Sequence, residues 1–203
     1  MGKGETTRVA VLDRAISLAS QTGLGGLTIG SLASAAELSK SGLFAHFRSK
    51  EALQLQVLAR ASERFVDLVV RPALAAPRGE PRVRELFERW LAWDRDALPG
   101  GCIFVAASFE LDDQPGPVRD RLVADQRDWN DTVVHIFSTG ITERHFRPDA
   151  DPEQFAQDMQ GLMLGCHWTS RLLGDPAAED RARHGFEALL TAARAAPPTD
   201  LNR

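Results

Sequence analysis

The sequence predicts an all-α protein. Apolar residues recur with helical spacing along nearly the whole chain, and no segment shows a sustained two-residue alternation of the kind that indicates strands. The 203 residues are 43% hydrophobic, which is enough to bury the core of one large domain or two small ones. We therefore expect a helical protein, and its helices can be located in order.

The first helix is predicted at 7–22, with apolar residues on one stripe. Gly23 to Gly26 end it, because glycine is the residue that most often follows a helix. This GLGG cluster is not interpreted as a phosphate loop, since it lacks the Lys-Ser/Thr ending and no strand precedes it. Thr28 is a suitable N-cap for a short second helix at 29–35.

A tight turn then leads to Ser39, which is predicted to cap a third short helix at 40–46. Ser49 is predicted to cap a fourth, which runs well past residue 65 to Pro72 or to the proline-rich break at 77–81. The later helices are expected at 82–97, 102–111, 118–141, 152–173 and 177–195. The domain boundary should lie within the long fourth helix, which gives domains at 1–55 and 56–203.

The net charge of −4 is divided unevenly between these domains. Residues 1–60 carry seven Lys or Arg against four acidic residues, and all three lysines of the chain lie in the first fifty positions. This asymmetry suggests a small module that faces a polyanion, joined to a larger acidic body.

Other classes of protein find little support in the composition. Cys102 and Cys166 are too few for a disulfide framework and have no metal-ligand spacing, so we expect reduced core cysteines, no metal and no cofactor. The chain has no run of eighteen apolar residues and no signal peptide, which predicts a cytoplasmic protein without membrane contact.

The stretch from Ser39 to Lys50 has the composition of a DNA-contacting helix. Small or hydrogen-bonding side chains lead the third helix, and only such residues let a helix enter the major groove: Ser39, Lys40, Ser41 and Gly42. Leu43 and Phe47 can pack back on the first two helices, while Phe44 and His46 project from other faces. Lys50 lies unfavourably in the first turn of a helix, which a nearby phosphate would explain.

At these residues the sequence resembles the tetracycline-repressor-like (TetR) family of bacterial transcription regulators. The second and third helices of the family's DNA-binding head correspond to LTIGSLASAAELSKSGLFAHFRSKEAL, from Leu27 to Leu53. The matching positions are Thr28, Ile29, Leu32, Ala33, Leu38, Ser39, Lys40, Gly42, Leu43, His46, Phe47, Lys50, Glu51 and Leu53, with Ala15 and Gly23 upstream. The resemblance implies a three-helix head with a helix-turn-helix at about 28–47, followed by a larger helical domain for ligand binding and dimerisation.

The resemblance also implies roles for single residues. Phosphate contacts are expected from Thr28, Ser39, His46 and Lys50, and groove-facing contacts from Lys40, Ser41, Leu43 and Phe44. Two positions depart from the family pattern. Phe44 replaces the usual tyrosine and cannot donate a hydroxyl to a phosphate, and Glu37 replaces the usual glycine of the turn.

In the larger domain the last two helices are candidates for a homodimer interface. Gly161 and Gly165 are spaced to let a partner helix approach closely, with Leu162, Cys166 and Thr169 near that face, and Phe186, Leu189 and Leu190 are the candidates on the final helix. Packing within one subunit could use the same surfaces. Aromatic residues are expected to point inward and either line a small-molecule pocket or fill the core: Trp90, Trp93, Phe104, Phe109, Trp129, Phe137 and Trp168.

These features predict a ligand-responsive repressor that binds a palindromic double-stranded DNA operator as a homodimer. An enzyme with His167 or His135 as base is the first alternative, but no catalytic constellation supports it. A helical interaction module that has lost DNA binding is the second, which Glu37 and Phe44 keep open.

Overall fold

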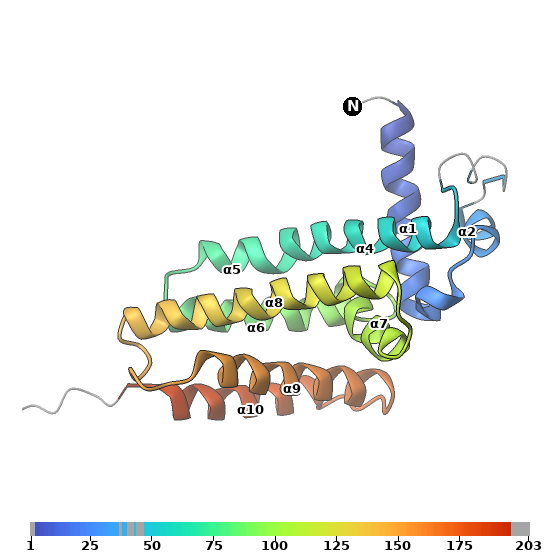
Figure 1. Cartoon of the computed structure of the whole chain (residues 1–203). Helices are drawn as coiled ribbons and strands as arrows, with labels where there is room; N and C mark the ends of the chain where they lie inside the picture. The colour runs from blue at the N-terminus through green and yellow to red at the C-terminus, as the bar shows by residue number, and fades with distance from the viewer. Residues whose placement is uncertain (1–2, 37, 40–42, 44–46, 196–203) are drawn as a thin grey trace, which may run out of the picture. The chain divides into compact units, whose positions relative to one another are not determined.

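The computed structural model describes residues 3–36, 38–39, 43 and 47–195 (Figure 1). Its helices are α1 (Lys3–Gly26), α2 (Ile29–Ala36), α4 (Lys50–Phe65), η1 (Val66–Val70), α5 (Arg71–Ala75), α6 (Glu80–Ala92), η2 (Trp93–Ala97), α7 (Ile103–Leu111), α8 (Pro117–Thr142), α9 (Pro152–Arg171) and α10 (Ala178–Ala193). The described residues form no strand, and only an isolated bridge joins Phe146 to Arg194. The all-α prediction is confirmed, whereas the predicted helix at 40–46 lies mostly outside the described residues.

The chain forms two compact units, which are treated separately below. One contains Met1–Leu68 and Ala92–Arg127, and the other contains Val69–Leu91 and Asp128–Arg203. Each unit thus combines segments that are far apart in the sequence. The first includes the predicted DNA-binding head together with α7.

In the first unit, the glycine cluster interrupts α1 close to its C-terminal end. Gly23 has φ 76° and ψ 164°, which breaks the helix in a conformation that favours glycine. Thr28 then caps α2 as predicted, because its Oγ1 accepts a hydrogen bond from the Ser31 amide at 2.9 Å. The apolar faces of these helices form a core with fully buried Ile16 and Leu32.

The helical stretch at 50–75 is long and is not a single regular α-helix. Ser49 caps α4, since its side chain accepts from the Ala52 amide at 3.0 Å. The helix then continues through the π-helical segment η1 into α5, whose first turn holds Pro72. The cap and the length match the prediction, but the π-helical segments η1 and η2 were not predicted. A π-helical segment shifts the backbone hydrogen bonds by one residue, and the spacing of apolar residues in the sequence does not reveal this shift.

The second unit is built around stacked phenylalanine rings. Phe137 of α8 stacks on both Phe146 and Phe155, with ring centroids 4.3 and 4.1 Å away. Phe87 of α6 stacks on Phe186 of α10 at 4.0 Å. Helices α9 and α10 lie side by side (Figure 1). These rings tie α6, α8, α9 and α10 into one core.

Candidate nucleic-acid interface

The structure describes the scaffold of the predicted DNA-binding face. Five of the nine predicted contact residues lie outside the described residues, as does Glu37: Lys40, Ser41, Gly42, Phe44 and His46. The other four, Thr28, Ser39, Leu43 and Lys50, have defined surroundings. Their positions show what holds each one.

Thr28 stands exposed at the N-terminus of α2. It forms a reciprocal cap with Ser31: the Ser31 amide donates to Thr28 Oγ1 at 2.9 Å, and the Thr28 amide donates to Ser31 Oγ at 2.9 Å. A helix N-terminus favours a nearby anion because its first amides and its dipole are positive. The surroundings of Thr28 therefore suit the phosphate contact that the resemblance implies.

Leu43 belongs to the core. Its side chain, like that of Phe47, has no exposed surface. The Leu43 amide donates to the Ser39 carbonyl at 3.2 Å, and the Phe47 amide donates to the Leu43 carbonyl at 2.8 Å, which is the spacing of helical turns. The predicted packing role of both residues is confirmed. The groove-facing role predicted for Leu43 was wrong, because a fully buried side chain cannot also contact a base.

Lys50 has an acceptor within the protein. Its ammonium group donates to the Gly25 carbonyl at 2.5 Å. The unfavourable position of a lysine in the first turn of α4 therefore has an explanation besides a phosphate. An ammonium group has three donors, so this bond leaves donors on exposed Lys50 for a phosphate.

Glu110 of α7 is a residue that the sequence analysis missed. Its carboxylate accepts from the Leu24 amide at 2.8 Å and from the neighbouring Gly25 amide. On the other side of this turn, Gln54 of α4 donates to the Leu24 carbonyl at 2.7 Å. The only signal in the sequence was the glycine cluster itself, which we had interpreted as a plain helix stop. A polar pocket of about 270 Å³ opens beside these residues and is also lined by Arg119.

The seven aromatic residues predicted to point inward do not form one site in either unit. Trp93 and Phe104 both meet Phe65 edge-on, with centroids 5.3 and 5.7 Å away. In the other unit Trp90 and Phe137 are buried, and half-buried Trp129 donates its indole N–H to Gln160 at 3.0 Å. Buried rings in each unit thus serve the core.

Two of the seven predictions were wrong. Phe109 is 69% exposed and Trp168 is 54% exposed. Each belongs to a helix whose buried side is already occupied by other residues, such as Ala107 in α7 and Met163 in α9. A helical stripe shows which residues share a face, but not which face the rest of the subunit covers.

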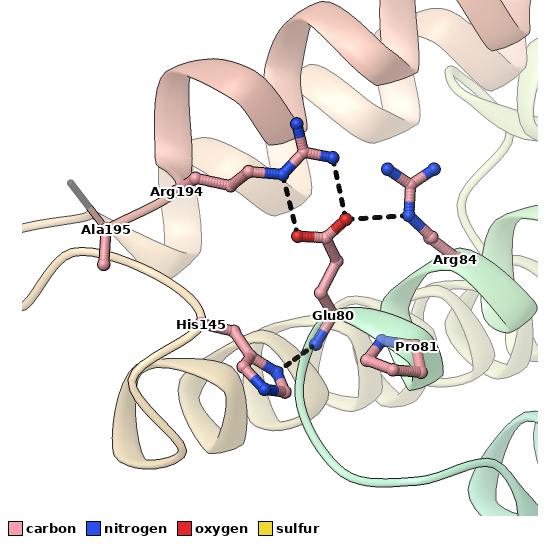
Figure 2. Close-up of a pocket in the computed structure, with 6 residues that line it drawn as sticks. All are labelled: Glu80, Pro81, Arg84, His145, Arg194 and Ala195. Carbon is pink, nitrogen blue, oxygen red and sulfur yellow. Dashed lines mark hydrogen bonds and ion pairs between the residues drawn. The ribbon is translucent and has the colours of Figure 1, made fainter. Parts of the chain in front are cut away.

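A second pocket, of about 420 Å³, lies in the second unit around Glu80 (Figure 2). The Glu80 carboxylate accepts from Arg194 at 2.8 and 2.9 Å and from Arg84 at 2.8 Å, which lowers its pKa to about 2. Glu187 pairs with both arginines at 2.7 Å. The Glu80 amide donates to His145 Nδ1 at 3.0 Å. These charged groups pair with one another and so link α6 to the end of α10. Because their charges are already paired, the pocket beside them is not a strong ligand site.

The remaining candidate chemistry is sparse in the described part of the chain. Cys102 and Cys166 are buried thiols, and burial raises the pKa of the Cys102 thiol to about 11, so it stays protonated at neutral pH. No group of three His, Cys, Asp or Glu side chains within residues 3–36, 38–39, 43 and 47–195 is placed to hold a metal ion. Among the same residues, no helix has the length and apolar character to span a bilayer.

Two family models match the sequence. Residues 11–57 match the model for bacterial regulatory proteins of the tetR family, and residues 79–186 match the model for the tetracyclin repressor-like C-terminal domain. Together they cover the helix-turn-helix head and most of the helical body. No curated protein matches the chain.

Solved structures share the fold over nearly the whole chain. A TetR transcriptional regulator from Chloroflexus aurantiacus J-10-FL is 26% identical, with a TM-score of 0.85, and the match covers 97% of this chain and 100% of that one. AibR, solved in complex with isovaleryl coenzyme A and operator DNA, is 22% identical, with a TM-score of 0.72 and coverage of 91% and 97%. A regulator from Saccharomonospora viridis in complex with choline is 20% identical, with a TM-score of 0.78 and coverage of 96% and 100%.

Proposed function

We propose that this chain, which belongs to the TetR family of DNA-binding transcriptional regulators, acts as a homodimeric repressor that releases a palindromic operator when a small molecule binds. The observation that carries the proposal is the match to both family models in the expected order, one for the head and one for the body. The AibR complex, which holds both an acyl-coenzyme A and operator DNA, supports the pairing of the two ligand classes. The regulators of this family are transcription factors, so we do not propose a reaction for His135 or His167.

The proposed DNA-binding domain is 1–55, and 56–203 is the proposed body. Within the head, Thr28, Ser39, His46 and Lys50 are proposed to contact phosphates, and Lys40, Ser41 and Phe44 are proposed to face the groove. The exposed cap of α2 and the exposed lysine of α4 support the two contacts whose surroundings are described. We propose the cytoplasm as the place where the protein works, because its proposed partner is DNA.

An exposed stripe on α9 supports the homodimer. Gly161, Gly165, Trp168 and Leu172 follow one another at spacings of three or four residues and lie on one face. A Cβ atom at either glycine would meet nothing within 4 Å, and the Leu172 side chain is 70% exposed. On α10 the proposed interface differs from the one that the sequence predicted. Phe186 and Leu190 are buried in the subunit core, so exposed Ala188 and Ala192 are proposed in their place.

The effector is proposed to bind in the helical body and to favour one of two conformations of the dimer. It can shift the equilibrium only by its difference in affinity for the two states. Among the predicted aromatic residues, half-buried Trp129 of the second unit remains the candidate for its lining, because the buried rings serve the core. Choline in the Saccharomonospora viridis regulator supports a small organic molecule as the ligand class.

The proposed function is tested by selecting bound DNA from a random pool and then measuring binding of the enriched duplex. We expect a palindrome, because a two-fold dimer presents two heads. Lys50→Ala should weaken binding to enriched and random duplexes alike and lower the slope of log K against log salt by about 0.9 per lost phosphate contact. Lys40→Ala should instead change which sequences bind. No salt-dependent binding to any duplex would contradict the proposal.

The homodimer is tested with Trp168→Glu, followed by sedimentation velocity. A carboxylate in the centre of an apolar interface should cost about 2 kcal/mol or more of association free energy, so the variant should be monomeric at micromolar concentration. Leu74→Glu is the matched control, because Leu74 is 44% exposed on α5 and lies outside the proposed interface. Equal masses for both variants would reject this face.

A further inference from the structure

We propose that Glu110 is a positioning residue for DNA binding, through which α7 sets the geometry of the Leu24–Gly25 turn and of Lys50. The inference rests on the proposed phosphate contacts of Thr28 and Lys50. It adds a residue outside the helix-turn-helix whose loss should weaken DNA binding.

The turn is held from two sides. The peptide group between Leu24 and Gly25 donates its N–H to Glu110 of α7 and accepts, at its carbonyl, the Gln54 amide of α4 at 2.7 Å. The preceding amide, that of Leu24, also donates to Glu110, at 2.8 Å. Hydrogen bonds at both ends of one peptide polarise each other, and a bond to a charged carboxylate is among the stronger kinds. α7 and α4 therefore fix this peptide in both position and orientation.

Both described phosphate candidates are attached to this turn. The carbonyl of Gly25 accepts the Lys50 ammonium group at 2.5 Å, which orients that side chain. Thr28, the cap of α2, follows Gly25 by three residues, so the start of α2 is anchored by the same segment. A shift of the Glu110 carboxylate would move the Gly25 peptide and with it both groups.

The site is also shaped to admit the carboxylate. A Cβ atom on Gly25 would lie 2.5 Å from Glu110 Oε1, and one on Gly23 would lie 2.8 Å from Glu110 Oε2. Gly23 additionally has a positive φ, but Gly25 does not, so the lack of a side chain at Gly25 is explained by the approach of Glu110 alone. The glycine cluster therefore does more than end α1, because it makes room for a side chain of α7.

The experiment measures the affinity of the full-length protein for a random-sequence 30-base-pair duplex and for a duplex enriched from a random pool, across a salt series. Glu110→Ala should weaken both by about fivefold, since one oriented charge contact is lost. Removing an acid also reduces repulsion from DNA. Asp113→Ala is the control for that effect, because Asp113 is an exposed acid in the turn after α7.

A combination of variants separates positioning from folding. Because Glu110 is proposed to act through Lys50 and Thr28, Glu110→Ala should lower the salt slope as Lys50→Ala does, and the double variant should lose less affinity than the product of the two single losses. Gly25→Ala should weaken binding because its Cβ meets the carboxylate, and adding Glu110→Ala should not weaken it further. If Glu110→Ala does not fold, Glu110→Gln takes its place, since glutamine replaces one of the two accepting carboxylate oxygens by an NH2 donor and carries no charge.

The outcomes distinguish this inference from the proposed function. Multiplicative losses in the Glu110 and Lys50 double variant, or a Glu110→Ala that binds like Asp113→Ala, would overturn the positioning role and leave DNA binding intact. Lower thermal stability with an unchanged salt slope would show a merely structural role. Absence of binding by the unaltered protein would instead overturn the proposed function.

Discussion

Two joints of the molecule hold their helices in different ways: the stacked rings of the second unit, and the junction of α1 with α7 in the first. In the second unit, rings stack across helices: Phe137 stacks on Phe146 and Phe155, and Phe87 stacks on Phe186. In the first unit, hydrogen bonds to backbone amides join α1 and the Leu24–Gly25 turn to α7 and to the loop that precedes α7. The carboxylate of Glu110 binds amides of the turn, and Ser20 accepts from the Gly100 amide at 3.0 Å.

This difference matters because the two kinds of contact respond differently to a small displacement. Stacked apolar rings gain free energy from buried area, which changes little when helices slide slightly. Hydrogen bonds weaken steeply once distance and angle depart from the optimum. The stacked rings therefore tolerate small shifts of their helices, whereas the hydrogen bonds between α7 and the Leu24–Gly25 turn depend closely on the position of α7.

The largest expected effect concerns the stacked rings. Phe137 is fully buried, so Phe137→Ala should lower the free energy of unfolding by about 3–5 kcal/mol through lost burial and a cavity. Phe109→Ala is the control, because that ring is 69% exposed and its loss should change stability by about 0.5 kcal/mol or less. Urea denaturation measures both. Similar losses for the two variants would reject the assignment of Phe137 to the core and Phe109 to the surface.

A smaller effect is expected from the charged cluster of the second unit. The arginines lower the pKa of Glu80 to about 2, below the value of about 4.3 in an unfolded chain. A lowered pKa stabilises the fold above the unfolded value, and this stability is lost as the pH falls from about 5 to about 2. Glu80→Gln should therefore cost about 2 kcal/mol at pH 7, after allowance for partial solvent screening.

The pH series supplies the check on this prediction. The difference in unfolding free energy between Glu80→Gln and the unaltered protein should shrink as the pH approaches 2. Glu88→Gln is the control, because Glu88 pairs with Arg183 at the surface with 48% of its side chain exposed, and such pairs contribute less than about 1 kcal/mol. A pH-independent difference for Glu80→Gln would show that shape, and not charge, is what the cluster needs.

The sequence predicted most of the helices, because their signals are local. The predicted caps at Thr28 and Ser49 each bond an amide three residues on, and residue types alone can indicate such bonds. The exposed positions of Phe109 and Trp168 were not predicted, since they depend on which face the subunit covers. Periodicity carries no information on that choice.

The candidate site was predictable only in part for the same reason. The DNA-facing residues form a local pattern that a single stretch of sequence contains. Glu110 acts on a turn 85 and 86 residues earlier, and Glu80 pairs with Arg194 at a separation of 114 residues. A glutamate bound to amides has no charged partner whose spacing could reveal it.

The smallest expected effect concerns the hydrogen bond between Ser20 of α1 and the Gly100 amide, which is separate from the Glu110 contacts. The Ser20 side chain is buried, donates to the Ser17 carbonyl at 2.8 Å and accepts from the Gly100 amide. Ser20→Ala removes the Gly100 acceptor and should cost about 1 kcal/mol. Ser108→Ala in the same unit is the control, because that hydroxyl donates to the Phe104 carbonyl of its own helix.

These two serines separate contacts between segments from contacts within one helix. Thermal unfolding should show a lower midpoint for Ser20→Ala than for Ser108→Ala. The Ser20 variant should also bind DNA more weakly if the contacts of α1 with α7 and its preceding loop position the head, because Ser20 lies in α1 four residues before the Leu24–Gly25 turn. Unchanged DNA affinity despite lower stability would confine the positioning role to the Glu110 turn, and an unchanged midpoint would mean that water replaces the serine at Gly100.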